Sequence, residues 1–350
     1  MPTFSIIIPV CNGASYLCEC LESVRGQDFA NWECICVDDA SCDETPAILA
    51  KYTHLDNRIR IVTNNERKGV SASRNIALGM VAGEYVTFLD ADDALSEHWL
   101  GYAFELIRSQ DPDLIRLQYL PWTEGQERPV AKDEGCNETI DGINDVVAWG
   151  WRTFLCGGHS WLLFIRRQAL GNVCFPEDLA VREDVVFDMD AIMRMKRVCA
   201  AGYRGYFYRM RNDSAWHRSR RLDDAVNFPL ACSRIYSEQS GLLDKSGYKM
   251  EMALASYVRA ILNNLQEWVM MADGDARWHD RKVIDSTEKA LSPLGQEAFK
   301  HAGSWSYALR YAMDRKSLSV ISYLMHFLIF KAKVSSYLKR KLGLVRVFTR

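Results

Sequence analysis

Residues 83–93 read Gly-Glu-Tyr-Val-Thr-Phe-Leu-Asp-Ala-Asp-Asp, an apolar run followed by three carboxylates in four positions. A turn residue precedes the run and β-forming side chains dominate it, as in a strand buried in a sheet. Such a strand delivers its acidic end, Asp90 to Asp93, to the edge of the sheet. Carboxylates this close repel one another unless a cation neutralises them, water solvates them or they hold protons.

This acidic end has two interpretations. Hard divalent ions such as Mg²⁺ and Mn²⁺ prefer carboxylate oxygens and often share their remaining positions with substrate phosphates. We therefore predict a metal–diphosphate site at Asp90 and Asp92. The alternative is a solvated turn in which Asp93 caps the next helix.

The first 120 residues alternate between strand and helix patterns at short spacing, which predicts a parallel α/β sheet. Ligands of such sheets bind beyond the carboxyl ends of the strands, so the polar groups there should meet in one crevice. Neither GxGxxG after the first strand nor GxxxxGK[ST] is present, which disfavours a dehydrogenase-type dinucleotide fold and a P-loop. Strands are expected at 4–10, 32–37, 58–63, 83–90 and 113–120, and helices at 14–26, from the N-cap Ser41 to 54, at 70–81 and at 96–109.

The composition of the chain disfavours a nucleic-acid-binding protein, a disulfide-rich protein and a zinc protein. The chain has 350 residues and a formal net charge of −2, enough for one large or two smaller domains and without the basic excess that favours nucleic acid. The 11 cysteines are odd in number and form no CxxC pair, so reduced thiols in a cytoplasmic protein fit better than disulfides or a zinc site. The first apolar run lacks the basic flank and the length of a signal peptide.

Four segments carry a resemblance to a known family. IIIPVCN, VDDASCDET, GVSASRNIAL and GEYVTFLDADD occur in that order within the first hundred residues, and together they resemble the family 2 glycosyltransferases of GT-A fold. The resemblance implies a Rossmann-like, mostly parallel sheet with a helical C-terminal extension. It also implies inverting transfer of a sugar from a nucleoside diphosphate to a hydroxyl group, with Mn²⁺ or Mg²⁺ as cofactor.

The resemblance also assigns roles to residues at the strand ends. Asp39 would contact the base, unless it caps a helix. Arg74 would lie near the diphosphate, because a guanidinium suits phosphate oxygens, unless it is a surface residue of an amphipathic helix. Asp92 would ligate the metal, and Asp90 would bind ribose or the metal through water. The remaining assignments are Pro9, Val10 and Asn12 in the base and ribose pocket, Ala91 within the DxD motif, and Cys11 as a departure where an aromatic residue is usual.

The acceptor side is expected further along the chain. Arg182-Glu183-Asp184 resembles the ED motif of the family, at the start of a helix facing the acceptor, and an inverting displacement needs a carboxylate to take the proton of the acceptor hydroxyl. Asp184 is the candidate base, with Asp178 as the second candidate. The alternative is that two acids simply favour a helix N-terminus.

Two later segments differ in how closely they resemble the family. The apolar run 161–165 has Leu163 or a neighbour where the family often has a lysine, so that donor contact is not carried over. Residues 206–217 resemble the YxYRxRxxS pattern at the end of the catalytic domain. Arg211, Ser214 and His217 could close over the diphosphate, with His217 as a third metal ligand unless, like most single histidines, it binds none.

The rest of the chain is less regular. Residues 121–138 are polar and predict a loop or flap, 141–155 a helix, and 221–350 a helical region. We expect a catalytic domain at 1–220, with a nucleotide-sugar half at 1–120 and an acceptor half at 121–220. The apolar run 318–330 is too short to span a bilayer, and basic residues follow it. That tail either docks on the core or attaches the protein to an anionic inner membrane surface.

We therefore expect a metal-dependent glycosyltransferase that uses a UDP-sugar, since base contacts of this type suit uracil. Its acceptor would be a saccharide or lipid-linked saccharide of a bacterial surface polysaccharide, by resemblance. Two alternatives stay open. A sugar-phosphate nucleotidyltransferase would carry a glycine-rich basic loop after the first strand, and a non-catalytic nucleotide-sugar binder would tolerate loss of Asp184.

Overall fold

A computed structural model describes residues 1–135, 137–154, 159–179, 182–211, 227 and 229–235. The chain divides into two compact units. The first comprises 1–150, 157–179 and 183–214, and the second comprises 151–156, 180–182 and 215–350. The predicted helical region 221–350 and its apolar and basic tail therefore lie outside the described residues, apart from 227 and 229–235. The predicted boundary at 220 stays a prediction.

Strands and helices alternate in the first half of the first unit, whereas the second half begins with three consecutive strands. The first half contains β1 (Phe4–Val10), α1 (Ala14–Arg25), β2 (Trp32–Asp38), α2 (Thr45–Leu55), β3 (Ile59–Thr63), α3 (Val70–Leu78), β4 (Tyr85–Phe88), β5 (Ala94–Leu95) and α4 (Trp99–Gln110). The second half contains β6 (Leu114–Thr123), β7 (Lys132–Asp133), β8 (Glu138–Asp141), α5 (Ile143–Phe154), the 3₁₀ turn η1 (Ser160–Leu162), β9 (Leu163–Arg166), α6 (Arg167–Leu170), α7 (Glu183–Ile192) and β10 (Arg197–Met210).

The first four long strands form a parallel sheet in the order β3-β2-β1-β4. All seven residues of β1 are buried, as its continuous apolar run requires for a strand covered on both faces. The chain moves outward from β1 to β3 and then returns past β1 to form β4. Polar groups that follow β1 and β4 therefore meet where the strand order reverses, which is where ligands bind in open α/β sheets.

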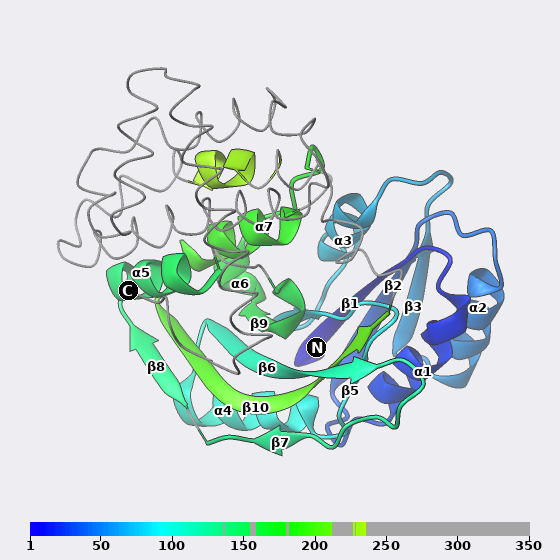
Figure 1. Cartoon of the computed structure of the whole chain (residues 1–350), viewed down its shortest axis with the longest axis horizontal. Coiled ribbons are helices and arrows are strands. Elements are labelled where there is room, and N and C mark those ends of the chain that lie inside the picture. Colours follow the sequence, from blue (N-terminus) through cyan, green and yellow to red (C-terminus); the bar gives the residue numbers. More distant parts are fainter. Residues whose placement is uncertain (136, 155–158, 180–181, 212–226, 228, 236–350) are drawn as a thin grey trace, which may run out of the picture. The chain divides into compact units, whose positions relative to one another are not determined.

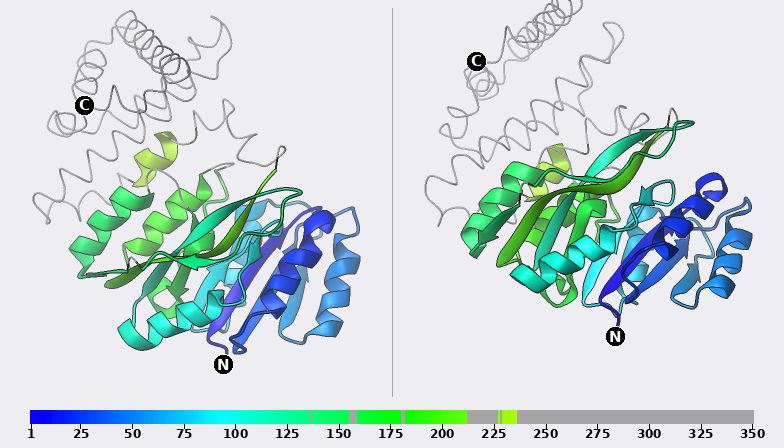
Figure 2. Two further views of the ribbon diagram at one scale, coloured as in Figure 1. Left: turned by 60° about the horizontal axis from the view of Figure 1, so that its bottom comes forward. Right: turned by 90° about the horizontal axis from the view of Figure 1, so that it is seen from below.

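Helices cover both faces of this sheet (Figures 1 and 2). Figure 1 shows α1 and α2 on one face and α3 on the other. This arrangement follows from right-handed crossovers, because a connection that reverses its direction along the sheet must also change face. The predicted α/β fold with a mostly parallel sheet is confirmed in this half of the unit.

The second half extends the sheet through β9, which is antiparallel to both β4 and β6. The long strand β10 pairs in parallel with β6, and the short strands β5, β7 and β8 pair with it antiparallel. Figure 1 shows β6 and β10 running side by side. Since β5 follows the DxD motif directly, the acidic loop is held between the end of β4 and β10.

Several boundaries differ from the sequence-based expectation. The helix expected after Ser41 begins only at Thr45, so Ser41 is not its N-cap. The helix expected from residue 96 begins at Trp99, because Ala94 and Leu95 pair with β10. The polar segment 121–138 is not a plain loop: β6 continues to Thr123, and β7 and β8 form edge strands. Edge strands leave many side chains exposed, which explains their polar composition.

A glycine is required at position 83, just before β4. A Cβ atom at this position would lie 2.6 Å from the backbone nitrogen and the hydroxyl oxygen of Ser5. The Gly83 N–H donates to that hydroxyl over 2.8 Å. The glycine therefore allows β4 to approach β1 closely, and this contact places the acidic end of β4 beside the end of β1.

Two other sequence-based expectations bear on the class of protein. All nine cysteines of the described residues have free thiols, and five of them are buried. The neighbouring sulfurs of Cys34 and Cys36 lie 3.8 Å apart without a bond. Within the same residues, no helix has both the length and the hydrophobicity needed to cross a membrane.

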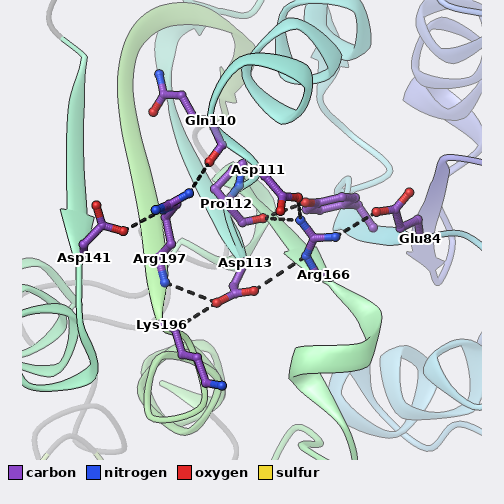
Figure 3. A network of polar contacts seen from close by, with 10 residues as sticks. Glu84, Gln110, Asp111, Pro112, Asp113, Asp141, Arg166, Lys196 and Arg197 are labelled. Atoms are coloured by element: carbon purple, nitrogen blue, oxygen red, sulfur yellow. Dashed lines mark hydrogen bonds and ion pairs between the residues drawn. The ribbon is translucent and has the colours of Figure 1, made fainter.

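An ion-pair network ties together the amino ends of β4, β6 and β10, at the sheet edge opposite the acidic loop (Figure 3). The Arg166 guanidinium lies 2.9 Å from Glu84, pairs with Asp111 and lies 3.6 Å from Asp113. The second carboxylate oxygen of Asp113 accepts the backbone N–H groups of Lys196 and Arg197. One arginine and one aspartate thus join the starts of three strands.

Arg166→Ala should lower the free energy of unfolding by about 2 kcal/mol, because it leaves a half-buried Asp113 without its guanidinium and breaks two further pairs. Urea unfolding measures the change. Arg108→Ala, at an exposed position of α4, is the control and should change stability by less than about 0.5 kcal/mol. Equal effects of the two substitutions would contradict a structural role for the network.

Candidate active site

The Asp39 carboxylate lies at the carboxyl end of β2 and is held by a ring of donors. One oxygen accepts the Asn64 side-chain amide and the Lys68 N–H, each over 2.8 Å, and the other accepts the Gly69 N–H over 2.8 Å. Burial raises the pKa of Asp39, but these hydrogen bonds and nearby Arg67 outweigh it and lower the pKa below its ordinary value. The carboxylate stays ionised, and its second oxygen can accept one more N–H, such as that of a base ring.

The segment after β1 lies against Asp39. The Asp39 N–H donates to the Val10 carbonyl over 2.8 Å, and Pro9 and Val10 are buried at the end of β1. Asn12 has a left-handed backbone with φ of 53°. Its N–H donates to the Ser41 hydroxyl and its side-chain oxygen accepts the Cys42 N–H, both over 2.9 Å. Ser41 therefore fixes this turn instead of capping α2.

Gly13 lies between the segment after β1 and the DxD motif. A Cβ atom at Gly13 would lie 2.7 Å from a Val10 methyl group and 3.8 Å from the Ala91 Cβ. The Cys20 thiol, from the same helix α1, donates to the Asp90 carbonyl over 3.7 Å. The residues expected to bind the base and those expected to bind the diphosphate therefore line one continuous edge of the sheet, as the sequence predicted.

Arg74 joins the two acidic motifs. Its side chain is only 5% exposed, and its two terminal nitrogens lie 2.8 Å from Asp90 and 3.2 Å from Glu183. Burial lowers the pKa of a guanidinium, but the nearby carboxylates of Asp90, Glu183 and Asp184 raise it, so Arg74 remains charged. The alternative of an ordinary surface arginine is wrong. Its expected contact with a diphosphate stays a prediction, since the observed partners are the two carboxylates.

Arg211, at the end of β10, reaches the same loop from the other side. Its guanidinium lies 2.7 Å from the Asp92 carboxylate and 5.0 Å from the centre of the Tyr16 ring. Burial and the neighbouring Asp90 raise the pKa of Asp92, while Arg211 lowers it in part. Asp90 and Asp92 therefore form a partly buried pair of acids with an arginine against each.

The residues present fit a divalent ion that is shared with a substrate. In the part of the chain that the structure describes, no three Asp, Glu, His or Cys side chains gather closely enough to hold a metal by themselves. The side chains of Asp90 and Asp92 are 30% and 27% exposed, and one oxygen of each pairs with an arginine. Mg²⁺ and Mn²⁺ are commonly held by one or two carboxylates plus phosphate oxygens. The pair can supply the carboxylates, and a diphosphate the rest.

Asp93, the third acid of the loop, does not cap the next helix as the alternative interpretation expected. Asp93 is 1% exposed and caps no helix. Its carboxylate accepts the Tyr206 hydroxyl and the Arg209 N–H, each over 2.7 Å. Burial, followed by the charges of Asp92 and Asp90, raises its pKa well above the ordinary value. Asp93 thus anchors the loop to β10.

Sequence reasoning missed the residues of β10 that fix this loop. The Arg209 side chain is buried, donates to the Asp92 carbonyl over 2.7 Å and lies 3.8 Å from the Trp122 ring. The Tyr206 hydroxyl accepts the Asp90 N–H over 3.3 Å. Tyr206 and Arg209 occur in the YxYRxR pattern, but nothing in the sequence showed which side chain would face the loop.

The candidate base lies at the start of α7, on the far side of Arg74. Glu183 and Asp184 occupy the first turn of the helix, where the dipole favours negative charge. Asp184 is half-buried and accepts the Val185 N–H over 2.8 Å. The second candidate, Asp178, is exposed in the segment before α7. Because Arg74 contacts both Asp90 and Glu183, the structure brings the two predicted acidic motifs together.

Two further expectations concern the third metal ligand and the position of Leu163. Ser214 and His217 lie outside the described residues, so the expected third metal ligand stays a prediction. Leu163, expected where the family often has a lysine, is buried in β9. It therefore contributes to the core of the sheet and not to the acidic site.

The sequence of this chain matches known proteins. The family described as Glycosyl transferase family 2 matches residues 5–166, which contain the carboxyl ends of β1 to β5. The putative glycosyltransferase EpsH of Bacillus subtilis (strain 168) is 33% identical over 87% of this chain and 87% of its own length. The chain belongs to glycosyltransferase family 2. The suspected resemblance in the first hundred residues is therefore confirmed.

Another relative and a solved structure extend the comparison. The minor teichoic acid biosynthesis protein GgaA of Bacillus subtilis (strain 168) is 32% identical over 64% of this chain, which spans about half (52%) of that protein. The crystal structure of Staphylococcus aureus TarS 1–349 in complex with UDP-GlcNAc matches with a TM-score of 0.70 and 19% identity, over 93% of this chain and 91% of that one. That likeness confirms the expected GT-A fold of this family 2 chain.

Proposed function

We propose that this chain is an inverting, metal-dependent glycosyltransferase that moves a sugar from a UDP-sugar to a hydroxyl group of a cell-surface polysaccharide. The family supports the sugar transfer. The names of related proteins, such as GgaA and the poly(ribitol-phosphate) glycosyltransferases, support a surface polymer as the acceptor. TarS has been solved with UDP and with UDP-GlcNAc, which supports uridine as the base.

In this proposal the crevice at the strand ends binds the donor. Asp39 accepts a ring N–H of the base, and the Pro9 to Asn12 segment lines the pocket beside it. Arg211 and the loop 90–92 face the diphosphate. Mn²⁺ or Mg²⁺, held by Asp90 and Asp92, would neutralise charge on the leaving diphosphate, so no general acid is needed. Asp184 takes the proton of the acceptor hydroxyl as it attacks.

One observation carries this proposal. The Arg74 guanidinium bonds Asp90 on one side and Glu183 on the other. An inverting transfer needs the leaving group and the base on opposite sides of the reacting carbon, within the reach of one sugar ring. Arg74 holds the two acidic motifs next to each other, which supports such an arrangement. A pyrophosphate-forming nucleotidyltransferase would instead need a basic glycine-rich loop, and CNGASYL after β1 lacks one.

A screen of nucleotide sugars tests the proposed reaction. UDP-glucose, UDP-galactose, their N-acetylamino forms and GDP-mannose are each incubated with the protein and Mn²⁺, and nucleotide release is measured. We expect slow release of UDP from at least one UDP-sugar, and loss of that release when a chelator replaces Mn²⁺. Release from none of these donors, or release that is insensitive to the chelator, would contradict the proposal.

A further inference from the structure

A cluster of aromatic rings lies between the acidic loop and α7, and the reaction proposed above does not use it. The Trp161 ring, from η1, lies 4.4 Å from Tyr206 and stacks on Tyr208 at 5.5 Å with an angle of 14°. His159 packs edge-on against Trp161 at 5.0 Å and stacks on Tyr119 at 6.1 Å. The five rings come from β6, β10 and the segment before β9.

One end of this cluster is fixed to the acidic loop and the other to α7. At one end, the Tyr206 hydroxyl binds the Asp90 N–H and the Asp93 carboxylate. At the other, the His159 N–H donates to Asp188 over 2.9 Å. Asp188 lies in α7 one turn after Asp184, and therefore on the same side of that helix. The rings thus extend from the loop expected to hold the diphosphate toward the helix that carries the candidate base.

Two tyrosines of the cluster have unused binding capacity. Trp161 is 7% exposed and Tyr206 is fully buried, whereas Tyr119 and Tyr208 are half-buried. Among the described residues, neither the Tyr119 nor the Tyr208 hydroxyl has a hydrogen-bond partner. Burial, together with the charges of the Asp93, Asp90 and Asp92 carboxylates, raises the pKa of Tyr208 to about 12. The Tyr208 phenol is therefore a neutral donor close to the acidic loop.

This combination suits one class of ligand. The face of an aromatic ring is the negative part of its quadrupole and attracts the weakly positive C–H groups of a sugar ring. Phenol hydroxyls can donate to and accept from the hydroxyl groups of a sugar. In the part of the chain that the structure describes, Trp161 is the one ring that stacks on Tyr208, and Tyr119 packs against Tyr208 in a T-shaped contact at 6.0 Å. A purely structural cluster would instead bury or pair its hydroxyls, as Tyr206 does.

We propose that Tyr208 and Tyr119 form a subsite for the pyranose ring of a substrate, with Tyr208 as the stacking surface and both hydroxyls as hydrogen-bond partners. The proposal rests on the proposed sugar transfer and adds the residues that recognise the sugar. The ring that binds there belongs either to the donor sugar or to the terminal sugar of the acceptor, since both must lie between the diphosphate and the base.

Binding measurements on Tyr208→Ala test the subsite and identify the source of the sugar. Calorimetry in Mn²⁺ compares UDP with the UDP-sugars of the screen, and saturation-transfer NMR detects methyl β-glucopyranoside on the protein with UDP and Mn²⁺ bound. A donor subsite predicts about tenfold weaker binding of the UDP-sugar and unchanged binding of UDP. An acceptor subsite predicts unchanged UDP-sugar binding and loss of the methyl glucoside signal.

Two further variants separate the subsite from a loss of folding. Tyr208→Phe keeps the ring and removes the hydroxyl, so it should weaken sugar binding by a smaller factor than Tyr208→Ala. Tyr102→Ala removes a tyrosine of α4 that stacks on Tyr203 at 4.4 Å, outside the cluster, and should leave all these affinities unchanged.

The outcomes also separate this inference from the proposed function. If the wild-type protein binds UDP-sugars and Tyr208→Ala binds every probe as well as wild type, the subsite is overturned and the sugar transfer stands. Equal weakening of UDP and UDP-sugar would likewise overturn the subsite. If the wild-type protein binds no UDP-sugar, both proposals fall.

Discussion

Asp184→Asn should reduce the rate of sugar transfer by a factor of about 10² to 10⁴ and leave the affinity for the donor nucleotide unchanged. The amide keeps the size of the side chain but cannot take a proton from the acceptor hydroxyl. Arg74 keeps both of its observed partners, Asp90 and Glu183, so the acidic loop should not move. Transfer is measured by release of UDP in the presence of acceptor, and affinity by calorimetry.

Asp178→Asn is the matched control, because Asp178 is the second candidate base and precedes α7 by a few residues. We expect it to retain most of the transfer rate. If Asp178→Asn abolishes transfer while Asp184→Asn does not, the assignment of the base is wrong. If neither substitution lowers the rate, neither Asp184 nor Asp178 is the base, and another group takes the proton of the acceptor.

Asp92→Asn should weaken the binding of UDP in the presence of Mn²⁺ by about tenfold or more, because it removes one of two carboxylates that can reach a shared ion. The same change frees the Arg211 guanidinium, which lies 2.7 Å from Asp92. Without metal, that freed cation should partly compensate by attracting the diphosphate. The variant should therefore lose most of the difference between binding with Mn²⁺ and binding with a chelator.

Glu138→Gln serves as the control for that experiment, since it removes a carboxylate of the exposed edge strand β8. It should bind UDP and Mn²⁺ as wild type does. If Asp92→Asn binds UDP with an unchanged dependence on Mn²⁺, Asp92 is not a metal ligand.

The first half of the fold was predictable because its signals are local. The run from Phe4 to Val10 is apolar at every position, and a strand of that kind must be covered on both faces. Alternation with helices then sets the strands parallel, and parallel strands bring their carboxyl ends to one edge. The meeting of Asn12, Asp39 and Asp92 at that edge follows from those two steps.

The second half depends on contacts between distant residues, which a single sequence does not reveal. Arg74 binds Glu183, 109 positions later, and Asp93 binds Tyr206, 113 positions later. The sequence around Asp93 fits a helix cap as well as a buried anchor, and only the pairing of β5 with β10 decides between them. Similarly, the polar segment 121–138 carries edge strands whose existence depends on β10 as their partner.

The most direct test of the account is calorimetric titration of the wild-type protein with UDP, once in Mn²⁺ and once in chelator. In the proposed function, Asp90, Asp92 and the neighbouring strand ends bind a nucleoside diphosphate through a shared metal ion. Binding of UDP should therefore be saturable in Mn²⁺ and weaken at least tenfold in chelator. Absence of binding for UDP, and for GDP and CDP tested in the same way, would contradict it.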